Sequence, residues 1–135
     1  MQRLGIAYLL LIGMVGLVSA CERSGIDDGF GDASVTYLNS TTYVLEDGLI
    51  NVVATVENAR SDKVALAYAR CIASRFAINR GFTFARMVAN TTKQQGTRRT
   101  ATAIYSVSAE LPQGERKLDA EVVAVSCAEN GIPMV

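Results

Sequence analysis

Residues 61–79 read SDKVALAYARCIASRFAIN, and this stretch decides the fold because it shows the clearest helical periodicity in the chain. Its apolar side chains form one stripe, made of Val64, Tyr68, Ile72 and Phe76 with Ala65, Ala69 and Ala73 beside them. Ser61 suits the N-cap position, and Gly81 suits the left-handed residue that follows a helix. Because a single apolar stripe must be buried, this helix needs a sheet to pack against.

The sequence before the helix, residues 35–56, predicts strands. Along Leu49–Val56, apolar residues recur at every second position, which is the pattern of a strand with one buried face. Asp47-Gly48 precedes that strand and is a strong hairpin-turn signal, because glycine accepts the positive φ that such turns require. Tyr43–Glu46 is the expected partner strand.

The sequence after the helix predicts three further strands. The expected elements are a strand at Phe82–Val88, a polar loop at Asn90–Thr100, a strand at Ala101–Leu111, a turn at Pro112–Lys117, a last strand at Leu118–Cys127 and a tail at Ala128–Val135. The order β-β-α-β-β-β predicts one α+β domain over residues 35–135, with a single helix packed on one face of a mainly antiparallel sheet. Six aromatic residues are expected in its core, or as the lining of a pocket: Tyr37, Tyr43, Tyr68, Phe82, Phe84 and Tyr105.

Residues 1–20 have the pattern of a lipoprotein signal peptide. A positive start at Met1–Arg3 precedes fifteen apolar residues, Leu4–Val18, which are few for a membrane span and typical of a signal peptide. Val18-Ser19-Ala20-Cys21 then matches a lipobox, which predicts cleavage before Cys21 and lipidation of its thiol. An ordinary signal peptide and an uncleaved membrane helix are the alternatives. Residues 21–34 are rich in Gly, Asp and Ser and are expected to form a flexible tether.

The lipid anchor predicts the location of the protein. Several acyl chains on Cys21 hold a protein stably on a membrane. The residue after the cysteine is Glu22 rather than the aspartate of the inner-membrane retention signal, which favours the outer membrane. We therefore expect a membrane-anchored lipoprotein that faces the periplasm.

Cys71 and Cys127 are the two cysteines of the mature domain apart from Cys21. Export to an oxidising compartment predicts a disulfide between them, which would close a loop of about 57 residues. Two buried free thiols, or a redox or metal role, are the alternatives. A metal role is disfavoured because two cysteines without histidine make a poor zinc site.

The chain of 135 residues contains no histidine, which removes the usual nucleophile systems and the commonest metal ligand. No spacing selects a catalytic pair of carboxylates either, so the sequence predicts neither an enzyme nor a cofactor nor a metal. Residues 57–99 hold nine basic residues against two acidic ones, although the whole chain has no net charge and nothing points to nucleic acid. Lys93, Arg98 and Arg99 are therefore the candidate contacts for anionic lipid, cell-wall polymer or an acidic envelope protein, unless they only keep an exposed loop soluble.

The order of the elements and several short motifs resemble a family of small uncharacterised proteobacterial lipoproteins of the cell envelope. The matching stretches are Leu45-Glu46-Asp47, Ala73-Ser74-x-Phe76-Ala77-Ile78-x-x-Gly81-Phe82, Tyr105–Leu111, Asp119–Val123 and Asn130-Gly131. The chain lacks the glycine-rich insertion that is frequent in that family between the third and fourth strands, and it has two additional cysteines. The resemblance implies a lipid anchor and an α+β domain, and it implies no activity.

These observations favour a non-catalytic envelope lipoprotein that binds or scaffolds a partner. The alternative is an inhibitor or immunity-type lipoprotein that blocks a periplasmic hydrolase by inserting a loop, either residues 90–99 or residues 112–117.

The lipobox generates a first prediction. Replacing the acceptor thiol in Cys21→Ser should abolish acylation, because serine offers no thiol for the diacylglycerol. The variant should leave the membrane fraction in cell fractionation, and its mass should lack the acyl chains. A Cys21→Ser protein that still sediments with membranes would contradict the lipobox.

Overall fold

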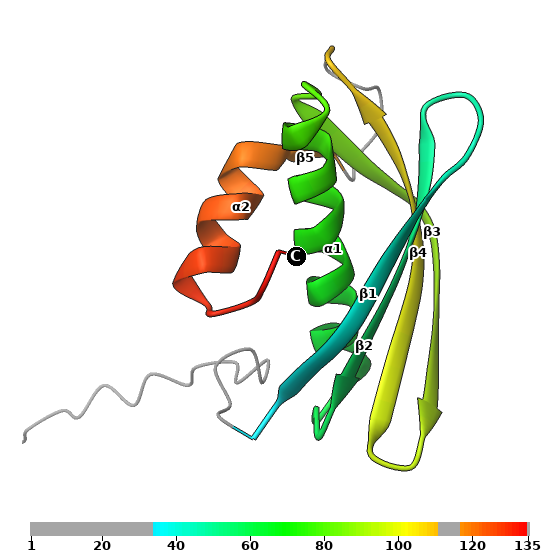
Figure 1. The fold of residues 1–135 in the computed structure, drawn as a ribbon, viewed down its shortest axis with the longest axis vertical. Helices are drawn as coiled ribbons and strands as arrows, with labels where there is room; N and C mark the ends of the chain where they lie inside the picture. Colours follow the sequence, from blue (N-terminus) through cyan, green and yellow to red (C-terminus); the bar gives the residue numbers. More distant parts are fainter. Residues whose placement is uncertain (1–33, 111–116, 135) are drawn as a thin grey trace, which may run out of the picture.

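The computed structural model describes residues 34–110 and 117–134, so the predicted signal peptide, Cys21 and most of the tether lie outside the described residues. The domain is α+β, as expected, with a five-stranded antiparallel sheet in the order β1-β2-β4-β3-β5 and two helices (Figure 1). The elements are β1 (Thr36–Val44), β2 (Leu49–Glu57), α1 (Asp62–Asn79), β3 (Phe84–Gln95), β4 (Arg98–Ser108), β5 (Lys117–Asp119) and α2 (Ala120–Glu129).

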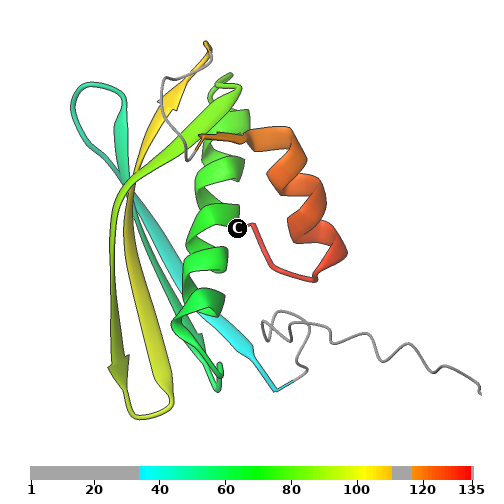
Figure 2. The same cartoon turned by 180° about the vertical axis from the view of Figure 1, so that it is seen from behind.

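The elements form three layers, which are the sheet, α1 and α2. Both helices lie on the same side of the sheet, with α1 between the sheet and α2 (Figures 1 and 2). Helix α2 packs against α1 and β5 rather than against the long strands. No described element covers the other face of the sheet. Even in the centre of the sheet, the side chains on that face are no more than half-buried.

The β1–β2 hairpin has the predicted turn. Asp47 and Gly48 both have positive φ, 59° and 72°, and the Leu49 amide donates to the Glu46 carbonyl at 3.2 Å. This is a type I′ turn, in which both central residues need left-handed backbone. The hairpin is longer than the predicted partner strand, because β1 begins at Thr36 and remains paired with β2 as far as Glu57.

Helix α1 confirms the predicted stripe and the predicted end. Gly81 adopts a φ of 80°, its amide donates to the Ile78 carbonyl at 3.1 Å, and the Phe82 amide donates to the Ala77 carbonyl at 2.8 Å. This pair of bonds is the Schellman motif, and it satisfies carbonyls that the helix itself leaves free. Ser61 occupies the N-cap position without a side-chain hydrogen bond to the backbone.

The core lies between α1 and the inner face of β2 and β4. The buried strand residues are Ile50, Val52, Ala54, Val56, Ala101, Ala103, Tyr105 and Val107. They alternate along their strands with partly exposed residues, as the pattern of Leu49–Val56 and Ala101–Leu111 predicts. Alanines on both β4 and α1 shorten the distance at which the helix can pack on the sheet.

The polar loop expected at Asn90–Thr100 is instead strand. Pairing of β3 with β4 continues to Gln95 opposite Arg98, and only Gly96 and Thr97 remain as the turn. Residues from Ala89 to Gln95 are exposed, because this end of the hairpin extends beyond the helices. A strand that is exposed on both faces has no apolar alternation, so the sequence pattern did not reveal it.

The last strand expected at Leu118–Cys127 is also incorrect, and with it the order with a single helix. Only Lys117–Asp119 forms strand β5, and Ala120–Glu129 forms helix α2. Asp119 caps this helix, since its Oδ1 accepts from the amides of Glu121 at 3.0 Å and Val122 at 3.3 Å. The valines of this segment favour a strand locally. Packing of Ala120, Val123 and Cys127 against α1 overrides that preference, and their spacing is helical.

The sulfur atoms of Cys71 and Cys127 lie 2.05 Å apart, at the distance of a disulfide. Both side chains are almost fully buried, at 0 % and 2 % exposure. Because Cys127 belongs to α2, this pair connects the two helices, whereas the sequence predicted a link between the helix and the last strand.

The cysteine pair generates a second prediction. Removing the bridge in a Cys71→Ala and Cys127→Ala double variant should lower the free energy of unfolding by about 4 kcal/mol, because the open chain gains entropy when it unfolds. Urea unfolding followed by circular dichroism measures the difference. Intact masses of the native protein before and after reduction should also differ by two hydrogen atoms. Two thiols that alkylate freely in the unreduced native protein would contradict the bridge.

Candidate functional site

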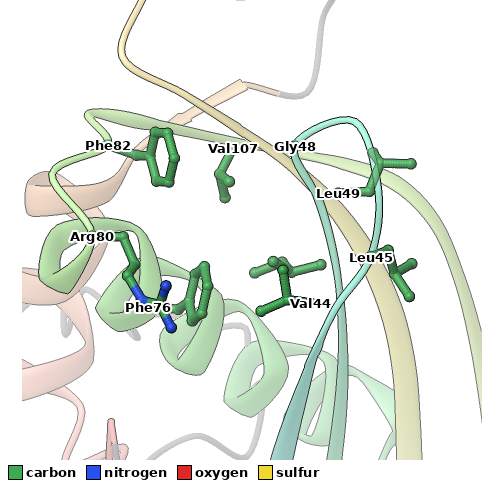
Figure 3. A pocket seen from close by; sticks show the side chains of 9 residues that line it. Val44, Leu45, Gly48, Leu49, Phe76, Arg80, Phe82 and Val107 are labelled. Carbon is green, nitrogen blue, oxygen red and sulfur yellow. The ribbon is translucent and has the colours of Figure 1, made fainter.

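An apolar pocket of about 170 Å³ lies where the β1–β2 turn meets the C-terminal end of α1 (Figure 3). Its lining residues come from β1, β2 and their turn, from the end of α1, from the segment after it, and from β4. They are Val44, Leu45, Gly48, Leu49, Ile50, Phe76, Arg80, Phe82 and Val107. Seven of the nine have large apolar side chains with no polar group, as is usual for a site that binds an apolar group.

Local backbone geometry positions the aromatic wall of this pocket. The left-handed Gly81 turns the chain after α1, and the bond from the Phe82 amide to the Ala77 carbonyl holds Phe82 beside the last turn of the helix. Both phenyl groups face the pocket in Figure 3. The aromatic wall therefore depends on the glycine cap that the sequence predicts.

The opposite wall is exposed to solvent. Val44 and Leu45, at the end of β1, expose 63 % and 40 % of their surface. Single exposed apolar residues are ordinary, but here two adjacent ones border a pocket. In Figure 3 the Leu45 side chain points away from Phe76 and Phe82, so exposed apolar side chains lie on both sides of the chain beside the pocket.

Arg80 is the one charged residue that lines the pocket. Its guanidinium carbon lies 5.0 Å from the centroid of the Phe76 ring, within the range of a cation–π contact. This contact keeps the cation beside the apolar wall. The pocket is therefore suited to an apolar group that carries a negative charge next to it.

Sequence reasoning anticipated only part of this site. Phe82 was among the aromatic residues expected in the core or in a pocket, and it lines the pocket. Tyr105 is fully buried in the core, and Tyr43 is exposed on the strand instead. One sequence signal for the pocket was available. Leu45 and Leu49 flank the Asp47-Gly48 turn, and apolar residues on both sides of a turn cannot all reach the core. Arg80 carried no signal in the sequence beyond its charge.

The structure does not bring Lys93, Arg98 and Arg99 together on one surface. Lys93 pairs with Thr100 and Arg98 with Gln95, which places both basic side chains on the uncovered face of the sheet. Arg98 is 63 % exposed and lies 3.7 Å from Glu57. Arg99, its neighbour in β4, points to the opposite face, toward α1. Lys93 and Arg98 thus lie on the uncovered face, whereas Arg99 bonds to residues within the domain.

Arg99 links the β3–β4 hairpin to the start of α1. Its Nη1 lies 2.6 Å from Oδ1 of Asp62, and its Nε donates to the Ala59 carbonyl at 3.0 Å. Thr92 of β3 also donates to Asp62, at 3.0 Å. The hydrogen bond from Arg99 and then that from Thr92 lower the pKa of Asp62 below its ordinary value of 3.8. Asp62 is therefore a charged clip between helix and hairpin.

Two further properties of the described part of the chain bear on its chemistry. No group of three or more Cys, Asp and Glu side chains there is placed to hold a metal ion. None of its helices is long and apolar enough to cross a membrane.

These features define a small α+β domain with an antiparallel sheet, two helices on one face that meet at a pair of cysteines, and an apolar pocket at one end. Residues 37–131, from β1 to the residue that ends the turn after α2, match the model of the family described as the YNQ4 C-terminal domain. The chain therefore belongs to this family. No curated protein and no solved structure matched the chain.

The Asp62 clip generates a third prediction. Its pKa is lower in the folded than in the unfolded chain, so its stabilisation is present above the unfolded pKa and is lost as the pH falls through the folded pKa. Arg99→Gln should lower the free energy of unfolding at pH 7 by about 1 kcal/mol, a modest value because Asp62 is half-exposed. The difference from the parent should shrink below about pH 4.

Urea unfolding at a series of pH values measures both effects. Arg98→Gln is the matched control, because Arg98 is exposed and 3.7 Å from its acidic partner. An Arg99→Gln variant whose loss of stability does not change with pH would show that Arg99 acts by packing alone.

Proposed function

We propose that this chain is a non-catalytic lipoprotein of the bacterial cell envelope that binds a partner protein through the apolar pocket. The observation that carries the proposal is the pocket itself, where exposed Val44 and Leu45 border a cavity with Arg80 at its side. Exposed apolar surface next to a preformed pocket is the usual anatomy of a protein-binding site.

The size of the pocket supports a protein partner over a lipid. A cavity of about 150 Å³ is the volume that holds one benzene molecule. A pocket of about 170 Å³ therefore accepts a single large apolar side chain, and a long acyl chain would extend well outside it. The proposed ligand is thus an aromatic or branched apolar side chain with a carboxylate close by, which would meet Arg80.

The proposed location comes from the amino-terminal sequence. The positive start, the fifteen apolar residues and the lipobox support a lipid on Cys21, and Glu22 supports sorting to the outer membrane. The tether then enters the domain at β1. The strand runs nine residues from Thr36 to Val44, roughly 30 Å at ~3.3 Å per residue, so the tether and the pocket would lie at opposite ends of β1. The resemblance to proteobacterial envelope lipoproteins supports the same location.

A second candidate function is inhibition of a periplasmic hydrolase. The β3–β4 hairpin supports it, because its tip extends beyond both helices and Ala89–Gly96 are exposed (Figure 2). The Asp62 clip holds this hairpin on α1, so the tip is presented rigidly, as an inhibitory loop requires. The second loop considered, residues 112–117, lies almost wholly outside the described residues.

Photo-crosslinking in intact cells tests the proposed function. A photoreactive phenylalanine analogue in place of Leu45 should crosslink one partner protein. Arg80→Glu should reduce that crosslink about tenfold, because loss of one charge-assisted contact costs roughly 1.4 kcal/mol. Arg75→Glu is the matched control, since Arg75 is exposed on the same helix and does not line the pocket.

The result also separates the two candidate functions. A crosslink that survives Arg80→Glu, or none from position 45, would contradict binding through the pocket. A single enzyme crosslinked from position 95, at the hairpin tip, and not from position 45 would favour the inhibitor.

A further inference from the structure

The two edges of the sheet differ in how they are protected. At the β3 edge, β5 pairs with Phe84–Arg86, a bulge follows between Met87 and Ala89, and Lys93 stands near the tip. At the opposite edge, β1 pairs with β2 alone among the described strands. Bulges, short cover strands and lysines are the devices by which proteins prevent strands from adding to an edge. The β3 edge has all three.

The β1 edge has few of these devices. Residues 34–45 contain no charged residue, no proline and no glycine, and they are rich in Thr, Tyr and Val. One bulge, between Tyr37 and Asn39, interrupts the strand near its start. From Asn39 to Val44 the register with β2 is regular. This part of β1 is a straight, uncharged edge of high strand propensity.

The hydrogen-bond pattern identifies which backbone groups of β1 face outward. The Leu45 amide donates to the Leu49 carbonyl at 2.8 Å, so the backbone amide of Leu45 points toward β2. In an antiparallel pair the residues alternate between facing the neighbouring strand and facing away. The backbone amide and carbonyl groups of Tyr43 and Thr41 therefore point toward β2, while those of Thr42 and Val44 point away from the sheet.

We infer that β1 pairs antiparallel with β1 of a second copy of this chain, which joins the two sheets into one. A two-fold axis at Thr42 would place each copy's Thr42 opposite the other, and each Thr41 opposite the second copy's Tyr43 on the uncovered face. Such Thr–Thr and Thr–aromatic cross-strand pairs are favourable. Because the paired segments contain no charged residue, pairing of two identical strands brings no like charges together. The contact is symmetric and closes after two chains.

The lipid anchors are compatible with this dimer. With the two-fold axis at Thr42, six residues from Thr36, antiparallel pairing would separate the starts of the two β1 strands by roughly 40 Å at ~3.3 Å per residue. The fourteen residues from Cys21 to Ser34 span up to about 46 Å when extended. Both chains can therefore reach one membrane. The pairing uses backbone groups of β1, so it is independent of binding through the pocket.

Light scattering of the full-length lipidated protein in detergent tests the inference. The protein should have the mass of two chains, and Thr42→Pro the mass of one, because proline removes an outward amide and leaves the β1–β2 bonds in place. Thr42→Val keeps the amide and should remain a dimer. Circular dichroism and the intact cysteine bridge verify that each variant is folded. A single chain at all concentrations, or a Thr42→Pro dimer, would overturn the inference.

Amide hydrogen exchange of the unmodified protein provides a test that no misfolded variant can obscure. Resolved by NMR, the amides of Thr42 and Val44 should exchange at least about tenfold more slowly above the dimerisation concentration than below it. Those of Thr41 and Tyr43, bonded to β2, should not change with concentration. Protection of Thr42 that is independent of concentration, or that appears only when another envelope protein is added, would refute self-pairing.

Discussion

The burial of helix α1 on two sides is the constraint on which the rest of the structure depends. One side of the helix packs on β2 and β4, and the opposite side packs on α2. Most of its residues are therefore buried, including five alanines. A helix buried on two sides has no room for large side chains all round, and the alanines let both neighbouring layers approach closely. The third layer exists because α1 still has an apolar side that the sheet does not cover.

The same constraint explains which elements the sequence could predict. The α+β class, the Asp47-Gly48 turn, the stripe of α1 and its Gly81 end follow from local patterns, and the structure confirms them. Helix α2 was missed because its valines favour a strand, although Asp119 before it and Gly131 after it are helix boundary signals. Ala67, Cys71 and Ser74 are buried although they lie off the predicted stripe, and Cys71 bonds to Cys127 of α2.

The candidate site shows a different limit of sequence reasoning. Basic residues close in sequence were grouped, but strand alternation sends Arg98 and Arg99 to opposite faces, and a strand had not been expected there. The pocket, by contrast, gathers residues from three strands, a turn, the end of α1 and the segment after it, and only Phe82 among them had been considered for such a role. Charged residues that are neighbours in sequence can be assigned to one surface only when their secondary structure is known.

The position of the cysteine pair has a consequence for how the protein would come apart. Helix α2 rests on α1 and β5 and makes few contacts with the long strands, so the Cys71–Cys127 link is its one covalent tie to the rest of the described fold apart from the chain itself. Reduction would loosen the carboxyl-terminal layer first, leaving the sheet and α1 as a subdomain. A chain without the bridge would then expose to proteases the side of α1 that α2 covers, so the bridge would also protect the chain from degradation.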